Sequence, residues 1–184
     1  QDPRDALVAR DGLTLRNLPQ EASVGTGSPR RAAQLLAVRP DLTIVDIRGN
    51  VDTRLGRVRE LGRYAKGGGK EDLDAVVLAA SGLARLGHSD AVTEFLDPSV
   101  VLPAPAQGAL AVECRTTDSR HGTLAKALAR IDDRKARLAA TAERAVLSHL
   151  EAGCAAPIGA LAQLNPASGK TPEVLTLDLS LIHI

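Results

Sequence analysis

Residues 24–50 read VGTGSPRRAAQLLAVRPDLTIVDIRGN, and they carry the clearest information about the fold. The stretch belongs to an alternation of β-rich runs and helical segments, in the order 22–26, 28–40, 42–47, 50–61 and 73–80. Strands that alternate with helices form a parallel sheet with helices packed on its faces. We therefore expect an α/β domain with a parallel-rich sheet.

The first helical segment has a well-defined start. Ser28 is a residue type that caps helices, and Pro29 suits the first helical position. Arg30 and Arg31 then fall in the first turn, where positive charge opposes the helix dipole. An anion bound there would meet free backbone N–H groups and two guanidinium groups. The alternative is that both arginines are simply solvated.

A second corner with arginines follows the run at 42–47. Arg48 and Gly49 end this run, Asn50 can cap the next helix, and Arg54 comes one turn later. Ligands of open α/β sheets bind at the carboxyl ends of the strands, where both corners are expected to lie. The sequence therefore predicts one crevice in which arginines from both corners bind an anionic ligand.

Composition excludes several classes of protein. Of the 184 residues, 44% are hydrophobic and 24% are charged, which is typical of a globular protein, and the net charge is +1. That charge and a single Tyr and Phe argue against a nucleic-acid partner. No apolar run is long enough for a membrane span. Two cysteines and no secretory signal favour a cytoplasmic location.

The two cysteines differ in their expected surroundings. Cys114 ends the apolar run 109–114, which we expect to be a buried strand. Cys154 follows Gly153 at the predicted end of a helix, with small residues on both sides. A helix C-terminus raises the pKa of a thiol, so the pattern alone leaves a buried, inert Cys154 as the alternative.

Other candidate sites are weaker. The four histidines have no metal-ligand spacing, so no metal site is expected. The loop 67–70 is Gly-Gly-Gly-Lys, which is similar to a phosphate loop. However, Glu71 stands where such loops have Ser or Thr, and no strand leads into it. A nucleotide-binding α/β protein is therefore the last of the alternatives.

The chain divides into several expected segments. Helices are predicted at 122–130 and 133–150, and the prolines near 103–105 indicate a crossing between domains. The expected parts are a remnant of a first domain at 1–15, an α/β domain at 16–105, a segment returning to the first domain at 106–131, and a partial α+β domain at 132–184. Because the chain starts at Gln1, we expect an N-terminal portion to be missing. Residues 179–184 are either a strand or a non-native tail.

Several segments carry a resemblance to one enzyme family. They are VGTGSPRRAAQL, RPDLTIVDIRGNVDTRL, LAASGLARLG, LPAPAQGALAVECR and TAERAVLSHLEAGCAAPIGA. Together they resemble the porphobilinogen deaminases, also called hydroxymethylbilane synthases, in the right order over residues 2–164. The resemblance implies two domains similar to periplasmic binding proteins and a smaller α+β domain. It also implies a monomer.

The resemblance implies a transferase of tetrapyrrole and heme biosynthesis. The family deaminates porphobilinogen and joins four units head to tail on a covalently bound dipyrromethane. By resemblance, Cys154 holds this cofactor through a thioether. The family's catalytic aspartate lies in an N-terminal segment without a counterpart here, so we expect no catalytic residue in this chain and no activity of the chain alone.

The remaining site residues are also implied by the resemblance. The cofactor-binding residues would be Thr26, Ser28, Arg30, Arg31, Arg48 and Gly49. The substrate-binding residues would be Arg48, Arg54, Arg85, Gln107 and Gly108. Two departures are Gly27, where many members have a second hydroxyl residue, and a longer loop at 62–72. The alternative is a non-catalytic, anion-binding module of periplasmic-binding type, which would keep the arginine crevice but need no thiol.

Overall fold

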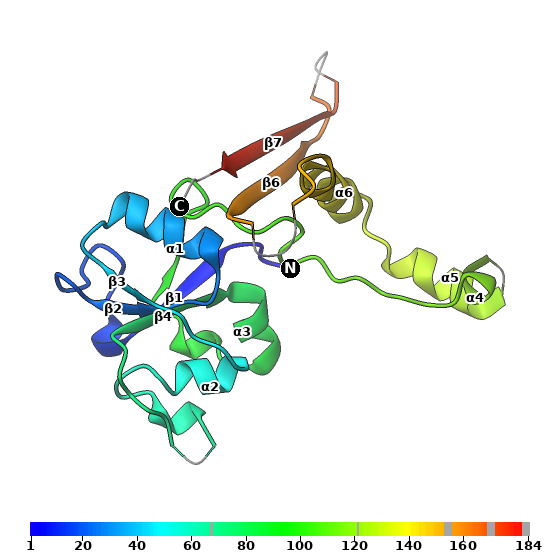
Figure 1. The fold of residues 1–184 in the computed structure, drawn as a ribbon. Helices are drawn as coiled ribbons and strands as arrows, with labels where there is room; N and C mark the ends of the chain where they lie inside the picture. The colour runs from blue at the N-terminus through cyan, green and yellow to red at the C-terminus, as the bar shows by residue number, and fades with distance from the viewer. Residues whose placement is uncertain (67, 121, 153–155, 169–171, 182–184) are drawn as a thin grey trace.

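A five-stranded sheet forms the centre of the larger part of the molecule (Figure 1). The structure is a computed structural model that describes residues 1–66, 68–120, 122–152, 156–168 and 172–181. In sequence order the strands are β1 Asp5–Ala9, β2 Ser23–Gly25, β3 Thr43–Val45, β4 Ala75–Ala79 and β5 Glu94–Phe95. Their order in the sheet is β3-β2-β4-β1-β5. β2 pairs in parallel with β3 and β4, whereas β1 is antiparallel to β4 and β5.

Helices cover both faces of this sheet. The helices are α1 Pro29–Val38, α2 Val51–Leu55 and α3 Ala80–Leu86, with 3-10 turns η1 Arg10–Gly12, η2 Gly62–Tyr64 and η3 Ser89–Ala91. Figure 1 shows α1 on one face and α2 and α3 on the other. Alternate residues of β1 supply the two cores: Leu7 packs in the cluster that contains Leu35 of α1, and Val8 packs in the cluster that contains Leu55 of α2. The α/β prediction is confirmed.

The first strand of the sheet was missed by the sequence analysis. The expected remnant at 1–15 contains β1, which lies between β4 and β5 and is buried along its whole length. Residues 5–9 therefore belong to the same sheet as β2–β4. The run Asp-Ala-Leu-Val-Ala is buried on both faces, so it lacks the alternation of polar and apolar residues that marks a half-buried strand.

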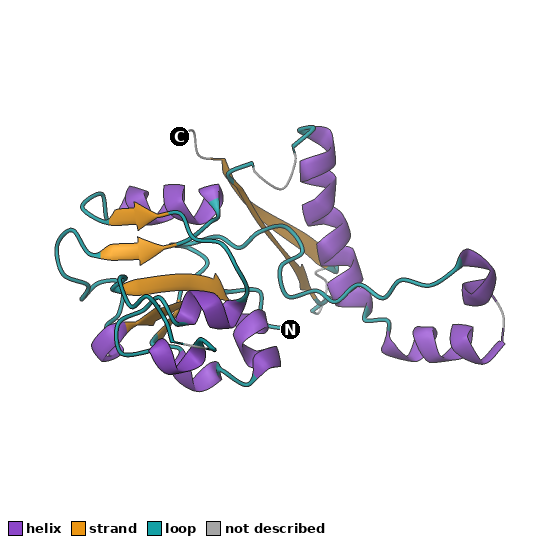
Figure 2. Cartoon of the chain, turned by 60° about the horizontal axis from the view of Figure 1, so that its bottom comes forward, coloured by secondary structure: helices purple, strands orange, loops and turns teal. Residues whose placement is uncertain are grey.

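A smaller part of the molecule follows the crossing near residue 103. It contains α6 Arg134–His149, packed on a hairpin of β6 Ile158–Asn165 and β7 Val174–Leu181. The helices α4 Thr116–Arg120 and α5 Gly122–Ile131 lie apart from both sheets in Figures 1 and 2. In the described part of the chain, no helix has the length and apolarity needed to cross a membrane.

The predicted helix at 133–150 is confirmed, and Asp133 caps it. The sequence also predicts an apolar stripe on this helix, made of Leu138, Ala142, Ala145, Val146 and His149. That prediction is only partly correct, because Ala145 and His149 are exposed and the buried residue is Glu143. The Glu143 carboxylate accepts hydrogen bonds from the Ala162 amide of β6 and from the Ala106 amide.

The expected strand at 109–114 is wrong. These residues have no regular secondary structure, Leu110 and Val112 are 63% and 62% exposed, and Cys114 is an exposed thiol rather than a core residue. A strand forms only where a neighbour accepts its backbone hydrogen bonds. In the described chain, none of the strands lies beside this apolar run.

Candidate functional site

Two corners with polar side chains lie at one edge of the sheet. Because β2 and β3 are parallel neighbours, the residues that follow them, Thr26 and Asp46, emerge at the same edge. The Thr26 amide donates to the carbonyl oxygen of Val45 at 3.0 Å, which ties the two corners together. The two corners therefore lie next to each other at this edge, where the predicted crevice would be.

The corner after β2 is organised by local hydrogen bonds. The hydroxyl of the buried Thr26 accepts from the Ser28 amide at 3.2 Å. The Ser28 hydroxyl in turn accepts from the Arg31 amide at 3.5 Å and caps α1, as the sequence predicts. Pro29 is the first helical residue. These contacts direct the first turn of α1, with both of its arginines, toward the sheet.

Arg30 and Arg31 are buried, so they are neither solvated nor free to bind an outside anion. They are 4% and 8% exposed, and both guanidinium groups bind the carboxylate of Asp5, which is 0% exposed. Arg30 Nη2 lies 2.7 Å from Asp5 Oδ2, and Arg31 Nη2 lies 2.8 Å from Asp5 Oδ1. The structure thus differs from both sequence-based expectations, because a carboxylate of the chain itself balances the two positive charges.

The rest of this buried cluster satisfies the remaining polar groups. Gln107 donates from Nε2 to Asp5 Oδ1 at 2.8 Å and to the Pro3 carbonyl oxygen at 2.7 Å. Burial by itself raises the pKa of Asp5, but the charges of Arg31 and Arg30 outweigh it and hold this pKa below its usual value. The carboxylate is therefore ionised at neutral pH.

The arginines of the second corner are more open. The Arg48 side chain is 78% exposed and lies 3.4 Å from the Asp46 carboxylate, while Arg54 Nε donates to the Gly49 carbonyl oxygen at 2.9 Å. Partial burial lowers the pKa of Arg54, and the positive charges of Arg31 and Arg48 lower it further. Arg54 is therefore affected by positive charge from both corners, which is favourable for an anionic ligand.

Gly27 lies where the two corners approach most closely. A Cβ atom built on Gly27 would be 2.5 Å from the Ile47 carbonyl oxygen and 3.2 Å from Asp46 Oδ1. A side chain at this position would push the corner after β2 away from the corner after β3. Glycine is thus required here by the close approach of two backbones.

The other expected substrate residues are placed differently. Gln107 bonds to the Asp5 carboxylate of the buried cluster. Gly108 has a φ of +83°, and a Cβ atom built on it would lie 2.9 Å from the carbonyl oxygen of Asp2. Arg85 is exposed in the last turn of α3, where its Nε donates to the Ser81 carbonyl oxygen at 3.2 Å. Its described hydrogen bond stays within α3, so Arg85 is not joined to the arginines of the two corners. Cys154 lies outside the described residues.

Two acidic residues of the site were missed by the sequence analysis. Asp5 is an acidic residue within an otherwise apolar run, and Asp46 stands two residues before Arg48. The position of Asp5 in an apolar run could have been used in the prediction, because an acidic residue is rarely fully buried without a cationic partner. The identity of the partner depends on the pairing of β1, which the local pattern does not show.

The Gly-rich loop does not have the architecture of a phosphate loop. Its described residues follow η2 and lead into β4, whereas a phosphate loop leads from a strand into the start of a helix. Lys70 lies 3.4 Å from Asp72. Gly67 lies outside the described residues. The nucleotide-binding alternative is therefore not supported.

Comparisons with known proteins give one consistent family. Residues 1–123 match the family model "Porphobilinogen deaminase, dipyromethane cofactor binding domain", and residues 137–182 match "Porphobilinogen deaminase, C-terminal domain". A porphobilinogen deaminase of Cutibacterium acnes is 91% identical over 178 residues, which are 97% of this chain and 53% of that protein. Those of Micrococcus luteus and Mycobacterium marinum are 53% and 58% identical, over 94% and 96% of this chain and 51% and 53% of their own lengths. The chain spans about half the length of the curated relatives it matches.

Proposed function

Because the chain belongs to the porphobilinogen deaminase family, we propose that it contributes the arginine-lined wall of the crevice in a hydroxymethylbilane synthase. In this proposal the whole protein deaminates porphobilinogen and joins four units head to tail on a dipyrromethane bound to Cys154. It acts as a cytoplasmic monomer of tetrapyrrole biosynthesis. The observation that carries the proposal is that β2 and β3 are parallel neighbours, so the arginine-bearing corners that follow them lie at the same edge of the sheet.

The chemistry of the side chains fits a dipyrromethane. Each of its pyrrole rings carries acetate and propionate groups, and guanidinium groups bind carboxylates through paired hydrogen bonds. Arg48 is largely exposed, and the described hydrogen bond of Arg54 uses only its Nε, so both would bind these carboxylates directly. When bound, the dipyrromethane supplies the free pyrrole carbon to which the first porphobilinogen is joined.

The buried arginines would act in a different way. Arg31 already donates to Asp5 through Nε and Nη2, and to the Val77 carbonyl oxygen through Nη1. Arg30 is similarly engaged by Asp5. We infer that these two arginines supply positive potential beneath the corner, while Thr26 and Ser28 orient its backbone. Direct contact with a ligand carboxylate would require Asp5 to give up some of these bonds.

The proposal can be tested with a chimera in which this chain replaces the matching part of the C. acnes porphobilinogen deaminase. We expect the purified chimera to carry the mass of a covalent dipyrrole on Cys154 and to convert porphobilinogen to hydroxymethylbilane. The Cys154→Ala chimera should lose both properties while keeping the same circular dichroism spectrum. A folded chimera that carries no dipyrrole, even when the cofactor is supplied, would contradict the proposal and favour a non-catalytic anion-binding module.

A further inference from the structure

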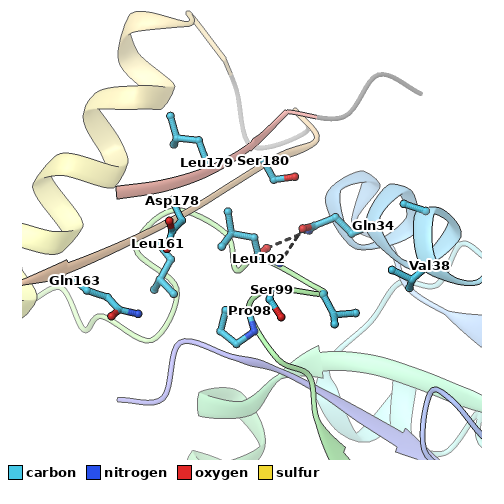
Figure 3. A pocket seen from close by; sticks show the side chains of 12 residues that line it. Gln34, Val38, Pro98, Ser99, Leu102, Leu161, Gln163, Asp178, Leu179 and Ser180 are labelled. Carbon is cyan, nitrogen blue, oxygen red and sulfur yellow. Dashed lines mark hydrogen bonds between the residues drawn. The ribbon is translucent and has the colours of Figure 1, made fainter. Parts of the chain in front are cut away.

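The crossing between the two parts of the molecule is held by an unusual set of polar contacts. We call residues 102–107 the crossing segment. Its first residue, Leu102, donates from its amide to Gln34 Oε1 at 2.8 Å and accepts from Gln34 Nε2 at 3.1 Å. Figure 3 shows these bonds, with the Gln34 side chain extending from α1 toward Leu102. Because Gln34 is buried, one side chain satisfies both backbone groups of Leu102 away from water.

The same residue also connects to the buried arginine pair. The Leu102 carbonyl oxygen accepts a second bond, from Arg30 Nη1. At the other end of the crossing segment, Gln107 donates to the Asp5 carboxylate that pairs with Arg30 and Arg31. The crossing segment is therefore attached at both ends to the arginine cluster of the α/β part.

The opposite side of the crossing segment is attached to β6. The Ala160 amide donates to the Pro103 carbonyl oxygen at 2.9 Å. A Cβ atom on Gly159 would lie 3.0 Å from both the Cβ and the carbonyl oxygen of Leu102, so β6 touches the segment directly. A glycine is needed at this point because the two backbones approach so closely.

Glu143 of α6 completes the attachment. This carboxylate is 5% exposed, and its two oxygens accept from different segments: Oε2 from the Ala106 amide at 2.5 Å and Oε1 from the Ala162 amide of β6 at 2.7 Å. Hydrogen bonds from two backbone N–H groups are what a buried carboxylate requires. Ala106 has a φ of +62°, a conformation that a non-glycine residue keeps only when its surroundings hold it.

Beside these contacts lies a cavity lined by residues of both parts of the molecule. This cavity of about 540 Å³ separates α1 from the hairpin, with Val38 and Ser99 on one side and Leu161 and Asp178 on the other (Figure 3). Close-packed side chains would otherwise set the distance between two layers. Beside this cavity, the contacts of the crossing segment contribute to that distance.

We propose that the crossing segment is a positioning link, held by Gln34 on one side and Glu143 on the other, that fixes the arginine corners relative to α6 and β6. This inference rests on the proposed function, because Cys154 lies between α6 and β6 in the sequence and would carry the pyrrole chain. Gln34 and Glu143 are positioning residues in this scheme. They touch neither cofactor nor substrate, and they act through the backbone of the crossing segment.

The link can be tested by removing acceptors while keeping the size of the side chain. In the chimera described above, Glu143→Gln replaces one of two accepting oxygens by an NH2 group, which cannot accept from an amide. Gln34→Leu removes both bonds to Leu102. The matched control is Glu173→Gln, which changes an exposed carboxylate paired with Arg134.

Two readouts separate positioning from general stability. We expect amide hydrogen exchange at Leu102, Ala106 and Ala162 to become about tenfold faster in the variants, with the core strand β4 unchanged. We also expect kcat for porphobilinogen to fall about tenfold or more, with KM within about threefold, because misplaced reacting groups slow a reaction without weakening binding. The mass of the bound dipyrrole should be retained.

The outcomes distinguish the link from the proposed function. Unchanged exchange at these amides, or a kinetic change no larger than that of Glu173→Gln, would overturn the link. A parent chimera without bound dipyrrole would overturn the proposed function, while the exchange measurement would still decide whether Gln34 and Glu143 hold the crossing segment. If Glu143→Gln does not fold, Gly159→Ala replaces it in the test. The added methyl group would lie 3.0 Å from Leu102 and should push β6 away from it, so amide exchange at the same residues should become faster.

Discussion

Arg30 and Arg31 differ from Arg48 and Arg54 in what balances their charge, although all four belong to corners at one edge of the sheet. The first pair is buried on the Asp5 carboxylate, whereas Arg48 is largely exposed and Arg54 is half-buried. Removing a charge from water is costly unless an opposite charge lies beside it. The comparison indicates that the buried pair is part of the framework and that the exposed pair is available to a ligand.

The largest expected effect comes from removing the charge that balances the buried pair. Asp5→Asn leaves two guanidinium groups buried without a carboxylate. We expect the free energy of unfolding of the 184-residue chain to fall by about 3–5 kcal/mol, measured by urea denaturation. The control is Asp11→Asn, at an exposed position, which should change it by less than about 0.5 kcal/mol. Equal losses of stability in Asp5→Asn and Asp11→Asn would show that the buried arginine pair does not depend on Asp5.

The same carboxylate predicts a dependence of stability on pH. The folded state lowers the pKa of Asp5, so folding is stabilised when this group is ionised in both states, above its unfolded pKa of about 3.9. This contribution should decrease as the pH falls below that value and disappear below the folded pKa. The measurement is the urea midpoint between pH 5 and pH 2. The difference between the parent chain and Asp5→Asn should shrink toward low pH, and a difference independent of pH would be contrary to this account.

Substitution in the exposed pair, Arg48 and Arg54, should change ligand binding but not stability. Arg48→Leu should leave the free energy of unfolding within about 0.5 kcal/mol of the parent value, because little is packed against this side chain. In the chimera it should weaken binding of porphobilinogen by about 1.5–3 kcal/mol, the value of one charge-assisted hydrogen bond. Arg16→Leu, at another exposed arginine, is the control for loss of charge alone. Unchanged binding would remove the role proposed for Arg48.

The smallest expected effect concerns the distance between the two corners. Gly27→Ala places a methyl group against the Ile47 carbonyl oxygen, and we expect it to destabilise the chain by about 1–3 kcal/mol. Gly82→Ala is the matched control, because Gly82 lies inside α3 with no heavy atom within 4 Å of the added methyl group. That control should stabilise the chain by about 0.5–1 kcal/mol. Urea denaturation measures both changes, and a Gly27→Ala chain as stable as the parent would show that the corners can separate freely.

Much of the α/β part could be predicted because its signals are local. The β-rich runs became β2, β3 and β4, and the Ser-Pro pair starts α1 where capping rules place it. The helix predicted at 133–150 was also correct, and the structure shows Asp133 as its cap. Each of these features depends on residues within a few positions of one another.

The errors concern interactions between distant residues. β1 was missed and residues 109–114 were wrongly expected to be a strand, because being a strand depends on which neighbours are available for pairing. The stripe on α6 was misjudged at Glu143, whose burial depends on amides that lie far away in the sequence. A pattern of apolar residues gives no information about such partners.

The sequence by itself determined the alternation of strands and helices, the capped start of α1, the two arginine corners and the resemblance to a family that the comparisons support. Only the tertiary structure decided that Arg30 and Arg31 turn inward to Asp5 while Arg48 stays exposed. The physical reason is that helix caps and periodicity arise from neighbours along the chain, whereas the burial of a charge depends on a partner that folding brings from another strand.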